Sequence, residues 1–287
     1  MDISFLRTLL FTPGNEPQRF EKAKESGADG VVIDLEDAIA LAEKDSTRDL
    51  VIKYFKQISP VNNFYYCLRI NSIKTQAGIK DIVAILENNI QPDALILPKV
   101  EYSDEVRILD ELLKNKNISY FATVESALGL HNADAIATSS ANIKSICFGG
   151  ADLAADLGVN VEWEPLFVAR SQIVKSAALA GIIAFDMPYL KVHQTDKTEL
   201  LNETRKVKSL GYYGKFCIHP EQIQSILEVF TPSPEEVSKA QQIVAAYKQS
   251  KGEVCEINGK MIDVPVFRSA ERILAKATKN YREDSHV

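Results

Sequence analysis

Two acidic residues that each follow a short apolar run are the first candidates for chemistry in this sequence. Glu125 comes directly after Tyr120–Val124, and Asp152 follows Ile146–Phe148 after a Gly-Gly-Ala turn. A carboxylate at the end of a buried strand is unfavourable unless something pairs with it. The two carboxylates could share one cation, and oxygen ligands of this kind suit Mg²⁺. Alternatively, each carboxylate pairs with a nearby Lys or Arg, and the spacing alone leaves both interpretations open.

The elements that would position these acids follow from the periodicity of the chain. Short apolar runs alternate with longer amphipathic segments, which indicates strands alternating with helices. The predicted strands are Thr8–Thr12, Gly30–Leu35, Tyr65–Ile70, Ala94–Pro98, Tyr120–Val124, Ser145–Phe148, Ile182–Asp186 and Lys215–Ile218. The predicted helices are Pro17–Glu25, Asp45–Gln57, Ala77–Glu87, Ser103–Asn115, Ser126–Thr138, Trp163–Ala180, Asp196–Ser209 and Glu221–Phe230. Continuous apolar strands indicate a covered parallel sheet, and eight such units favour an α/β fold of the (β/α)8 TIM barrel type over an open sheet.

Polar side chains gather where the predicted strands end. In a (β/α)8 barrel the active site lies at the C-terminal ends of the strands. The residues at these ends are Asn15, Asp34, Glu36, Asp37, Arg69, Asn71, Lys99, Glu125, Asp152, Asp186 and His219. The opposite strand ends carry fewer charges, so we predict that the active site lies at the C-terminal face.

Three of these side chains have more than one plausible role. Arg69 is suited to grip a carboxylate or a developing enolate oxygen, or it forms an ion pair with Glu36 or Asp37. Lys99 could form a Schiff base, but neighbouring acids would hold its ammonium charged and favour electrostatic anchoring. His219 is as well explained by a structural hydrogen bond as by catalysis.

Composition excludes several classes of function. The 287 residues carry 46% hydrophobic and 25% charged side chains and a net charge of −6, so no basic surface for nucleic acid or anionic membrane is expected. No apolar run reaches the ~18 residues of a membrane span, and the N-terminal residues lack a signal-peptide pattern. The four cysteines show no CxxC spacing, which favours reduced thiols in the cytoplasm, and the lack of a His/Cys cluster together with four scattered histidines argues against a zinc site.

The last part of the chain is longer than barrel closure needs. Ser233 is predicted to cap a helix, Asn258-Gly259 to form the turn of a hairpin, and a last helix to extend to about Lys279. We therefore divide the chain into a catalytic barrel, 1–232, and a C-terminal helix–hairpin–helix extension, 233–287. The extension is expected to pack on the barrel or on a neighbouring subunit, as a lid or an oligomer contact.

Several sequence motifs together resemble the citrate lyase β-subunit family, within the wider HpcH/HpaI aldolase group. The motifs, in chain order, are RTLLFTPGN, GADGVVIDLEDA, LRIN, LILPKVE, VESALG, FGGADLAADLG, ARSQIV, GKFCIHPEQI and MIDVPV. The resemblance extends over nearly the whole chain. It implies a (β/α)8 barrel, assembled as a homotrimer or hexamer. It also implies an Mg²⁺-dependent carbon–carbon lyase that cleaves a β-hydroxyacyl-CoA, such as citramalyl-, malyl- or citryl-CoA, to acetyl-CoA and a keto acid.

The same resemblance implies roles for the residues at the strand ends. Glu125 and Asp152 match the metal ligands of the family. Arg69 matches an arginine that contacts substrate oxygens. Glu36 and Asp37 match an acidic pair near the water shell of the metal.

Other matches and departures concern the substrate. Asp263 in MIDVP matches an aspartate that similar enzymes place over the active site of a neighbouring subunit, where it is our candidate catalytic acid. We also predict that Asn15 and Lys99 bind substrate. The family often has an acid where this chain has Lys191, and an Arg where it has Ala178. Both departures bear on CoA contacts or on the choice of acyl group.

Two alternatives to a stand-alone acyl-CoA lyase are weighed against the motifs. A class II-type aldolase acting on free 2-keto acids would lack CoA contacts, and the presence of Asp263 in its motif argues against it. A non-catalytic acyl-CoA-binding subunit would not need Glu125, Asp152 and Arg69 intact. Membership of a citrate lyase complex, with the thioester on a carrier protein, remains open.

Overall fold

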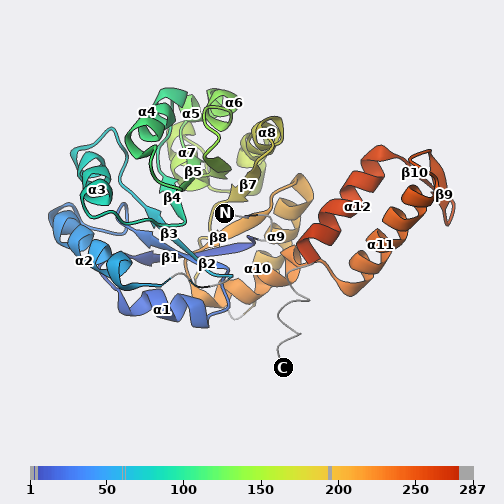
Figure 1. The fold of residues 1–287 in the computed structure, drawn as a ribbon, viewed down its shortest axis with the longest axis horizontal. Helices are drawn as coiled ribbons and strands as arrows, with labels where there is room; N and C mark the ends of the chain where they lie inside the picture. The colour runs from blue at the N-terminus through green and yellow to red at the C-terminus, as the bar shows by residue number, and fades with distance from the viewer. Residues whose placement is uncertain (1–2, 4–5, 60, 62, 193–195, 278–287) are drawn as a thin grey trace. The chain divides into compact units, whose positions relative to one another are not determined.

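The barrel predicted from the sequence is present. A computed structural model describes the chain apart from residues 1–2, 4–5, 60, 62, 193–195 and 278–287. Within the described residues, eight parallel strands close into a barrel in sequence order, with β8 paired to β1 (Figure 1). The strands are β1 (Thr8–Pro13), β2 (Gly30–Asp34), β3 (Tyr65–Arg69), β4 (Ala94–Leu97), β5 (Ser119–Val124), β6 (Ile143–Phe148), β7 (Ile183–Asp186) and β8 (Gly214–Cys217). Each predicted strand overlaps an observed one.

The strand register brings the polar strand ends together at one rim. β2, β4, β7 and β8 are buried at every position, because side chains fill the barrel and helices cover its outside. The register pairs Pro13 with Asp34, and Asp34 with Arg69. The last residues of β1, β2 and β3 therefore lie side by side.

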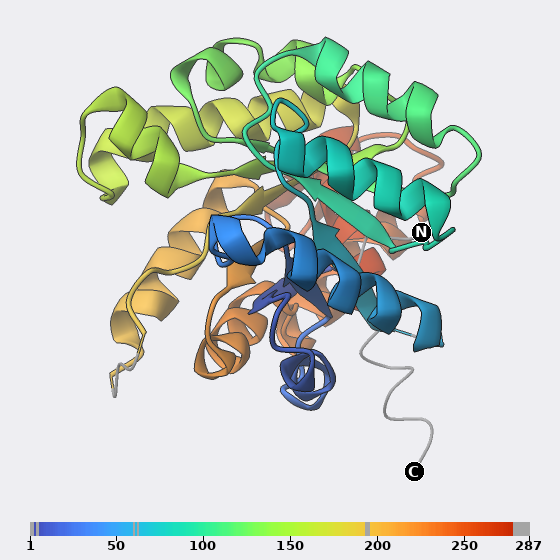
Figure 2. The same ribbon diagram turned by 90° about the vertical axis from the view of Figure 1, so that its left-hand side faces the viewer.

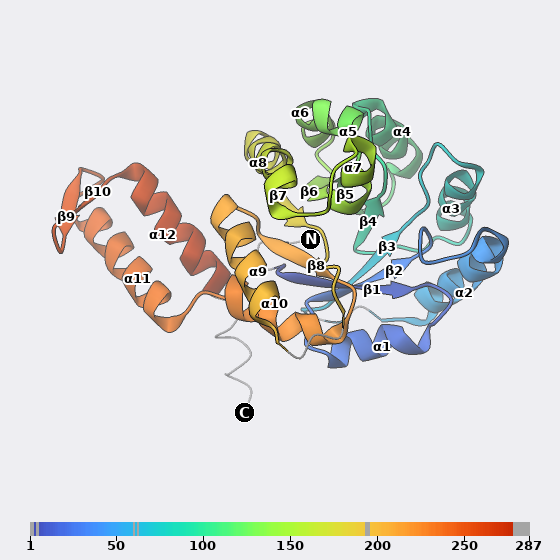
Figure 3. The same ribbon diagram turned by 180° about the vertical axis from the view of Figure 1, so that it is seen from behind.

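Helices surround the strands, as Figures 2 and 3 show from two further sides. They are α1 (Gln18–Glu25), α2 (Lys44–Gln57), α3 (Gln76–Glu87), α4 (Ser103–Leu113), α5 (Ala127–His131), α6 (Ala133–Ala137), α7 (Gly150–Leu157), α8 (Trp163–Ala180), α9 (Thr198–Leu210) and α10 (Ile223–Phe230), with 3₁₀ turns η1 (Leu41–Glu43) and η2 (Pro220–Gln222). Side chains cap several of them: the hydroxyls of Thr75 and Ser126 each accept a hydrogen bond from a first-turn backbone N–H.

The structure corrects two predictions about the helices. The predicted helix Ser126–Thr138 is divided into α5 and α6 at Asn132, whose side-chain amide donates to the carbonyl of Glu101 (2.8 Å). Helix α7 was not predicted, because the segment before Asp152 was interpreted as a turn. Asp152 instead lies in the first turn of this helix, where a carboxylate interacts favourably with the helix dipole.

The chain divides into two compact units, one of Arg7–Leu227 and a second that includes Leu6 and the chain from Glu228 on. In the second unit, α11 (Pro234–Gln249) and α12 (Val264–Ala277) lie side by side, and β9 (Cys255–Ile257) pairs with β10 (Lys260–Ile262) in the predicted hairpin (Figures 1 and 3). Ser233 caps α11 as predicted. The predicted end of the last helix near Lys279 lies outside the described residues.

Among the helices of the described residues, none is long and apolar enough to cross a membrane. Cys67, Cys147 and Cys217 are buried free thiols, and Cys255 is a partly exposed one.

Candidate active site

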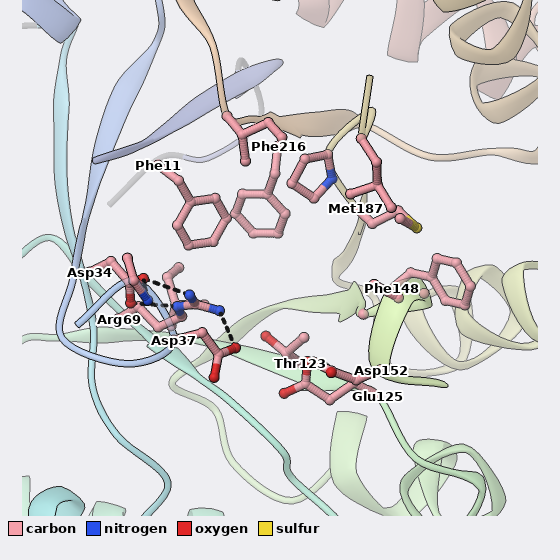
Figure 4. A pocket seen from close by; sticks show the side chains of 18 of the residues that line it. Phe11, Asp34, Asp37, Arg69, Thr123, Glu125, Phe148, Asp152, Met187 and Phe216 are labelled. Atoms are coloured by element: carbon pink, nitrogen blue, oxygen red, sulfur yellow. Dashed lines mark hydrogen bonds and ion pairs between the residues drawn. The ribbon is translucent and has the colours of Figure 1, made fainter. Parts of the chain in front are cut away.

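A cavity of about 400 Å³ opens at the C-terminal ends of the strands, where the active site was predicted. Acidic and basic side chains from β2, β3, α7 and the segment after β5 line one side of the cavity (Figure 4). Aromatic side chains from β1, β6 and β8 line the other side. The lining includes Phe11, Arg19, Asp34, Asp37, Arg69, Ile96, Thr123, Glu125, Phe148, Gly149, Gly150, Asp152, Met187, Pro188, Leu190, Phe216 and Ile218. Polar and apolar surfaces therefore face each other across one space.

Arg69 ends β3 and is fixed by carboxylates on one side of the cavity. Its Nε and Nη2 donate to the two oxygens of Asp34 (2.7 and 2.6 Å), and its Nη1 lies 3.0 Å from Glu36 Oε2 and 3.7 Å from Asp37 Oδ2. The guanidinium also lies 4.7 Å from the Phe11 ring centroid. Burial alone would lower the pKa of Arg69, but the hydrogen-bonded Asp34 raises it above the ordinary value, so the side chain stays charged. The predicted ion pairing with Glu36 or Asp37 is present, and Asp34 is an additional bidentate partner that was not foreseen.

Glu125 follows β5 and is almost completely buried, with 7% of its surface exposed. Its Oε1 accepts a hydrogen bond from the backbone N–H of Lys99 (2.6 Å). Burial, followed by the nearby carboxylates of Glu36 and Asp152, raises the pKa of Glu125 to about 8. A side chain at Gly149 would collide with Glu125, so the glycine makes room for this carboxylate.

Asp152 is brought to Glu125 by the start of α7. Gly150 packs against Phe148 and Met187 so closely that a Cβ would collide with both, which lets the helix begin directly beside β6. Asp152 itself is exposed to the cavity, and Figure 4 shows it next to Glu125. The arrangement joins one buried and one exposed carboxylate on neighbouring βα units.

These two carboxylates fit Mg²⁺ as a ligand pair. Among the described residues, no group of three or more His, Cys, Asp or Glu side chains is placed to hold a metal ion, so the pair would supply only two protein ligands. Mg²⁺ is held by one or two carboxylates and keeps waters and substrate oxygens in its other positions. Burial and the neighbouring carboxylates raise the pKa of Glu125, and a bound cation would favour its ionised form.

Lys99 links the acidic residues that follow β2 to Glu125. Its Nζ donates to Glu36 Oε1 (2.6 Å) and Asp37 Oδ1 (3.1 Å). Burial would lower the pKa of Lys99, but the hydrogen bond to Glu36 raises it above the ordinary value. The charged form is favoured, as expected for electrostatic anchoring and not for a Schiff-base lysine. Among the described residues, neither Lys99 nor Glu36 lines the cavity, so substrate binding by Lys99 stays a prediction.

Four other strand-end residues make structural contacts instead of lining the cavity. Asn15 donates weakly to Glu43 (3.4 Å), and Asn71 donates to buried Asp81. The Nδ1 of His219 accepts a hydrogen bond from the Glu221 N–H (3.3 Å) and caps η2. The prediction that Asp186 belongs to the active-site ring is corrected: its carboxylate accepts hydrogen bonds from buried Arg170 and Lys215.

Asp263 lies in the second unit, directly before α12. Its Oδ1 accepts a hydrogen bond from the N–H of Val266 (3.1 Å), so it caps this helix. A catalytic role for Asp263 remains a prediction. Lys191, one of the departures from the family pattern, pairs on the surface with Glu199 (2.6 Å).

The aromatic wall was not predicted. Phe11 and Phe216 lie with their ring centroids 5.0 Å apart, and Met187 and Phe148 continue the wall (Figure 4). Their apolar strands carry no polar–apolar alternation, so the sequence did not show which side chains face the cavity.

Comparison with known proteins identifies the family. A family model described as HpcH/HpaI aldolase/citrate lyase matches residues 7–220, more than half of the chain. The chain belongs to the HpcH/HpaI aldolase/citrate lyase family. A second model, a carbon–carbon bond lyase of the TIM-barrel fold, matches residues 167–280. As a member of this family, the protein is an enzyme of the carbon–carbon lyase class.

Individual members of the HpcH/HpaI aldolase/citrate lyase family align with nearly the whole chain. The citrate lyase subunit beta of Leuconostoc mesenteroides subsp. cremoris is 33% identical over 97% of this chain and 95% of its own. The mitochondrial citramalyl-CoA lyase of Mus musculus is 30% identical over 95% of this chain and 86% of its own. A structure of CitE from Mycobacterium tuberculosis, in complex with magnesium, acetoacetate and coenzyme A, matches with a TM-score of 0.77 and 29% identity, covering 95% of this chain and 98% of that chain. The predicted resemblance is confirmed.

Proposed function

We propose that this protein is an Mg²⁺-dependent lyase that cleaves a β-hydroxyacyl-CoA, such as citramalyl-, malyl- or citryl-CoA, to acetyl-CoA and a keto acid, or catalyses the reverse condensation. The observation that carries this proposal is the paired carboxylates of Glu125 and Asp152, which share one cavity with Arg69. The names of the citrate lyase and citramalyl-CoA lyase relatives, and the magnesium and coenzyme A bound in the related CitE structure, support it.

Glu125 and Asp152 would hold the metal. When bound, Mg²⁺ supplies a Lewis acid and a template for the carboxylate and hydroxyl oxygens of the substrate. Burial and the tight packing of Gly149 fix the Glu125 carboxylate in one orientation, which keeps the ligand preorganised.

Arg69 would stabilise negative charge that develops on the thioester oxygen. Cleavage removes the hydroxyl proton, breaks the neighbouring carbon–carbon bond, and leaves a keto acid and the enolate of acetyl-CoA. Asp34 holds the guanidinium in place through two hydrogen bonds, so its donors need not reorganise as the charge forms. A donor fixed in this way lowers the barrier more than a mobile one.

Protonation of the enolate carbon completes the reaction, and we assign it to Asp263. In this proposal the extension brings Asp263 over an active site, either as a lid or, in a homotrimer or hexamer, from a neighbouring subunit. Glu36 and Asp37 would lie near the metal's water shell. Phe11, Phe216 and the rest of the aromatic wall would exclude water from the reacting atoms.

Buried free thiols are in keeping with a cytoplasmic location. The departures at Lys191 and Ala178 leave the acyl group, and the use of free CoA or a carrier-bound thioester, to be decided by experiment.

The test is release of acetyl-CoA from citramalyl-, malyl- and citryl-CoA, each assayed with Mg²⁺ and with EDTA. We expect cleavage of at least one thioester with Mg²⁺ and none with EDTA. Failure to cleave any of the three, together with cleavage of a free 2-keto-acid aldol, would replace this function by the class II-type aldolase. Tight acyl-CoA binding without turnover would instead indicate a non-catalytic subunit.

A further inference from the structure

Lys99 occupies an unusual backbone conformation immediately after β4. Its φ is +54°, in the left-handed region that residues other than glycine and asparagine seldom adopt. Its N–H donates to Glu125 Oε1 (2.6 Å), and its carbonyl accepts a hydrogen bond from Lys74 Nζ (2.8 Å). A strained residue whose N–H and C=O are both held by hydrogen bonds often has a functional task.

The side chain of Lys99 is held between two carboxylates. Its Nζ lies 2.6 Å from Glu36 Oε1 and 3.1 Å from Asp37 Oδ1. Glu36 is 5% exposed, and its Oε2 has no hydrogen-bond partner among the described residues, although Arg69 Nη1 is 3.0 Å away. Glu36 Oε2 is therefore a buried oxygen that is ion-paired with Arg69 but accepts no hydrogen bond among the described residues.

This acidic pair lies beside the pair that would hold the metal. Lys99 contacts both pairs, because its N–H donates to Glu125 Oε1 (2.6 Å) and its Nζ lies 2.6 Å from Glu36 Oε1. Adjacent carboxylate pairs of this kind hold two divalent ions in many enzymes, with the ions about 3.5–4 Å apart. In this protein the Glu36–Asp37 pair already binds a cation, the ammonium group of Lys99.

We propose that the Lys99 ammonium takes the place of a second divalent cation and so limits the active site to one Mg²⁺ per chain. The proposal rests on the proposed function, because it assumes that Glu125 and Asp152 hold the first ion.

The contact distances support this assignment. Ammonium-to-oxygen distances of 2.6 and 3.1 Å keep Glu36 and Asp37 farther from the cation than the about 2.0–2.1 Å that Mg²⁺ requires. A cation on a side chain cannot dissociate or be chelated, and it carries one charge instead of two. Arg69 then remains the main source of positive charge opposite the single metal, free of competition from a second ion.

The experiment counts bound ions in the full-length, metal-stripped protein with Mn²⁺, an oxygen-seeking substitute for Mg²⁺. Calorimetry should give one Mn²⁺ per chain for the wild type and two for Lys99→Met, whose side chain has a similar length without the charge. Electron paramagnetic resonance should show an isolated ion in the wild type and a spin-coupled pair in the variant. One ion in Lys99→Met with wild-type affinity, or none in the folded variant, would overturn the proposal.

Further variants separate charge from backbone effects. Lys99→Arg keeps the charge and should bind one ion. Lys99→Gly takes a positive φ without strain and should bind two ions, so it replaces Lys99→Met if that variant fails to fold. The double variant Lys99→Met/Glu36→Gln should return to one ion.

The matched control is Lys74→Met, which removes a nearby ammonium that contacts Glu101 (2.7 Å) and the carbonyl of Lys99. It should bind one ion, and two ions here would overturn the assignment to Lys99. A wild type that binds no Mn²⁺ would count against the proposed metal site itself. One ion in both wild type and Lys99→Met would overturn only the role of Lys99.

Discussion

Two networks of charged side chains lie near the strand ends, and they differ in charge balance. Between β7–β8 and helices α8–α9, the buried network consists of Arg170, Lys215, Asp186 and Glu203, with Lys215 and Asp186 0% exposed. At the cavity, the active-site network consists of Arg69, Lys99, Asp34, Glu36, Asp37, Glu125 and Asp152. Cations match carboxylates in the buried network, whereas carboxylates outnumber cations in the active-site network.

The buried network contributes to stability, whereas the charge imbalance of the active-site network points to function. A balanced buried network holds strands and helices together, and breaking it leaves a charge without a partner. Burial, followed by the nearby carboxylates of Glu36 and Asp152, raises the pKa of Glu125, so ionisation of Glu125 destabilises the metal-free protein. Such a cost is common at functional sites, and a cation from solution would remove it.

The largest expected effect comes from Glu125→Gln. Loss of a metal ligand should lower kcat/KM by about three orders of magnitude. Above about pH 8, where the metal-free carboxyl is ionised, the same change removes a source of repulsion, so the thermal midpoint measured there in EDTA should rise. Glu87→Gln, at an exposed position on α3, should change neither value. A Glu125→Gln enzyme with normal turnover would contradict the account.

Asp186→Asn tests the other network. Removing this carboxylate leaves Lys215 and Arg170 with fewer partners in the interior, so the free energy of unfolding should fall by about 3–5 kcal/mol. Urea denaturation measures that loss, and calorimetry should show Mg²⁺ affinity unchanged in the folded variant. The comparison fails if Asp186→Asn is as stable as the wild type but no longer binds Mg²⁺.

Arg69→Lys should act on turnover. Lysine keeps one charge but cannot form both hydrogen bonds to Asp34, so kcat should fall by about 10²–10³-fold. Mg²⁺ affinity should change little. Steady-state kinetics distinguishes this result from weaker substrate binding, which would raise KM and leave kcat unchanged.

The smallest expected effect is a pH dependence of metal binding. Because the pKa of Glu125 is about 8, the carboxyl must lose a proton before it binds Mg²⁺ below that pH. Affinity should fall about tenfold per pH unit below pH 8, and calorimetry in buffers of different ionisation enthalpy should detect the released proton. Affinity that is constant from pH 8 to 6 would show that Glu125 is not the titrating ligand.

The same raised pKa sets the sign of the stability change in metal-free protein. The folded state binds a proton that the unfolded state has already lost between the ordinary pKa of 4.5 and about 8. Stability should therefore fall as the pH rises through this window. Glu125→Gln should remove that part of the slope.

The sequence predicted the barrel and much of the active-site network because each relevant strand ends abruptly. The apolar run before Glu125 and the run before Arg69 fix where β5 and β3 stop, and in a barrel all such ends share one face. The sequence could not show which residues on neighbouring strands would pair with each other. The contact between Asp34 and Arg69 depends on strand register, which brings together residues from separate βα units.

The sequence also did not show to which side of the sheet the acid at the end of a strand points. Asp186 ends β7 much as Asp34 ends β2, yet Asp186 contacts Lys215 and Arg170 while Asp34 lines the cavity. Strands that are buried on both faces are apolar throughout, so no alternation in the sequence shows which face a terminal acid joins. Helix α7 was missed for a related reason, since its Gly-Gly start is typical of a turn.

The central claim is that the surplus charge around Glu125 and Asp152 is the site of a catalytic divalent ion. It is tested most directly by the rate of acetyl-CoA release as metal-stripped enzyme is titrated with Mg²⁺, using whichever thioester is cleaved. We predict that the wild-type rate rises from background and saturates, while Asp152→Asn stays at background at the same Mg²⁺ concentrations. A wild-type rate that does not depend on Mg²⁺, or an Asp152→Asn curve that matches the wild type, would contradict the account.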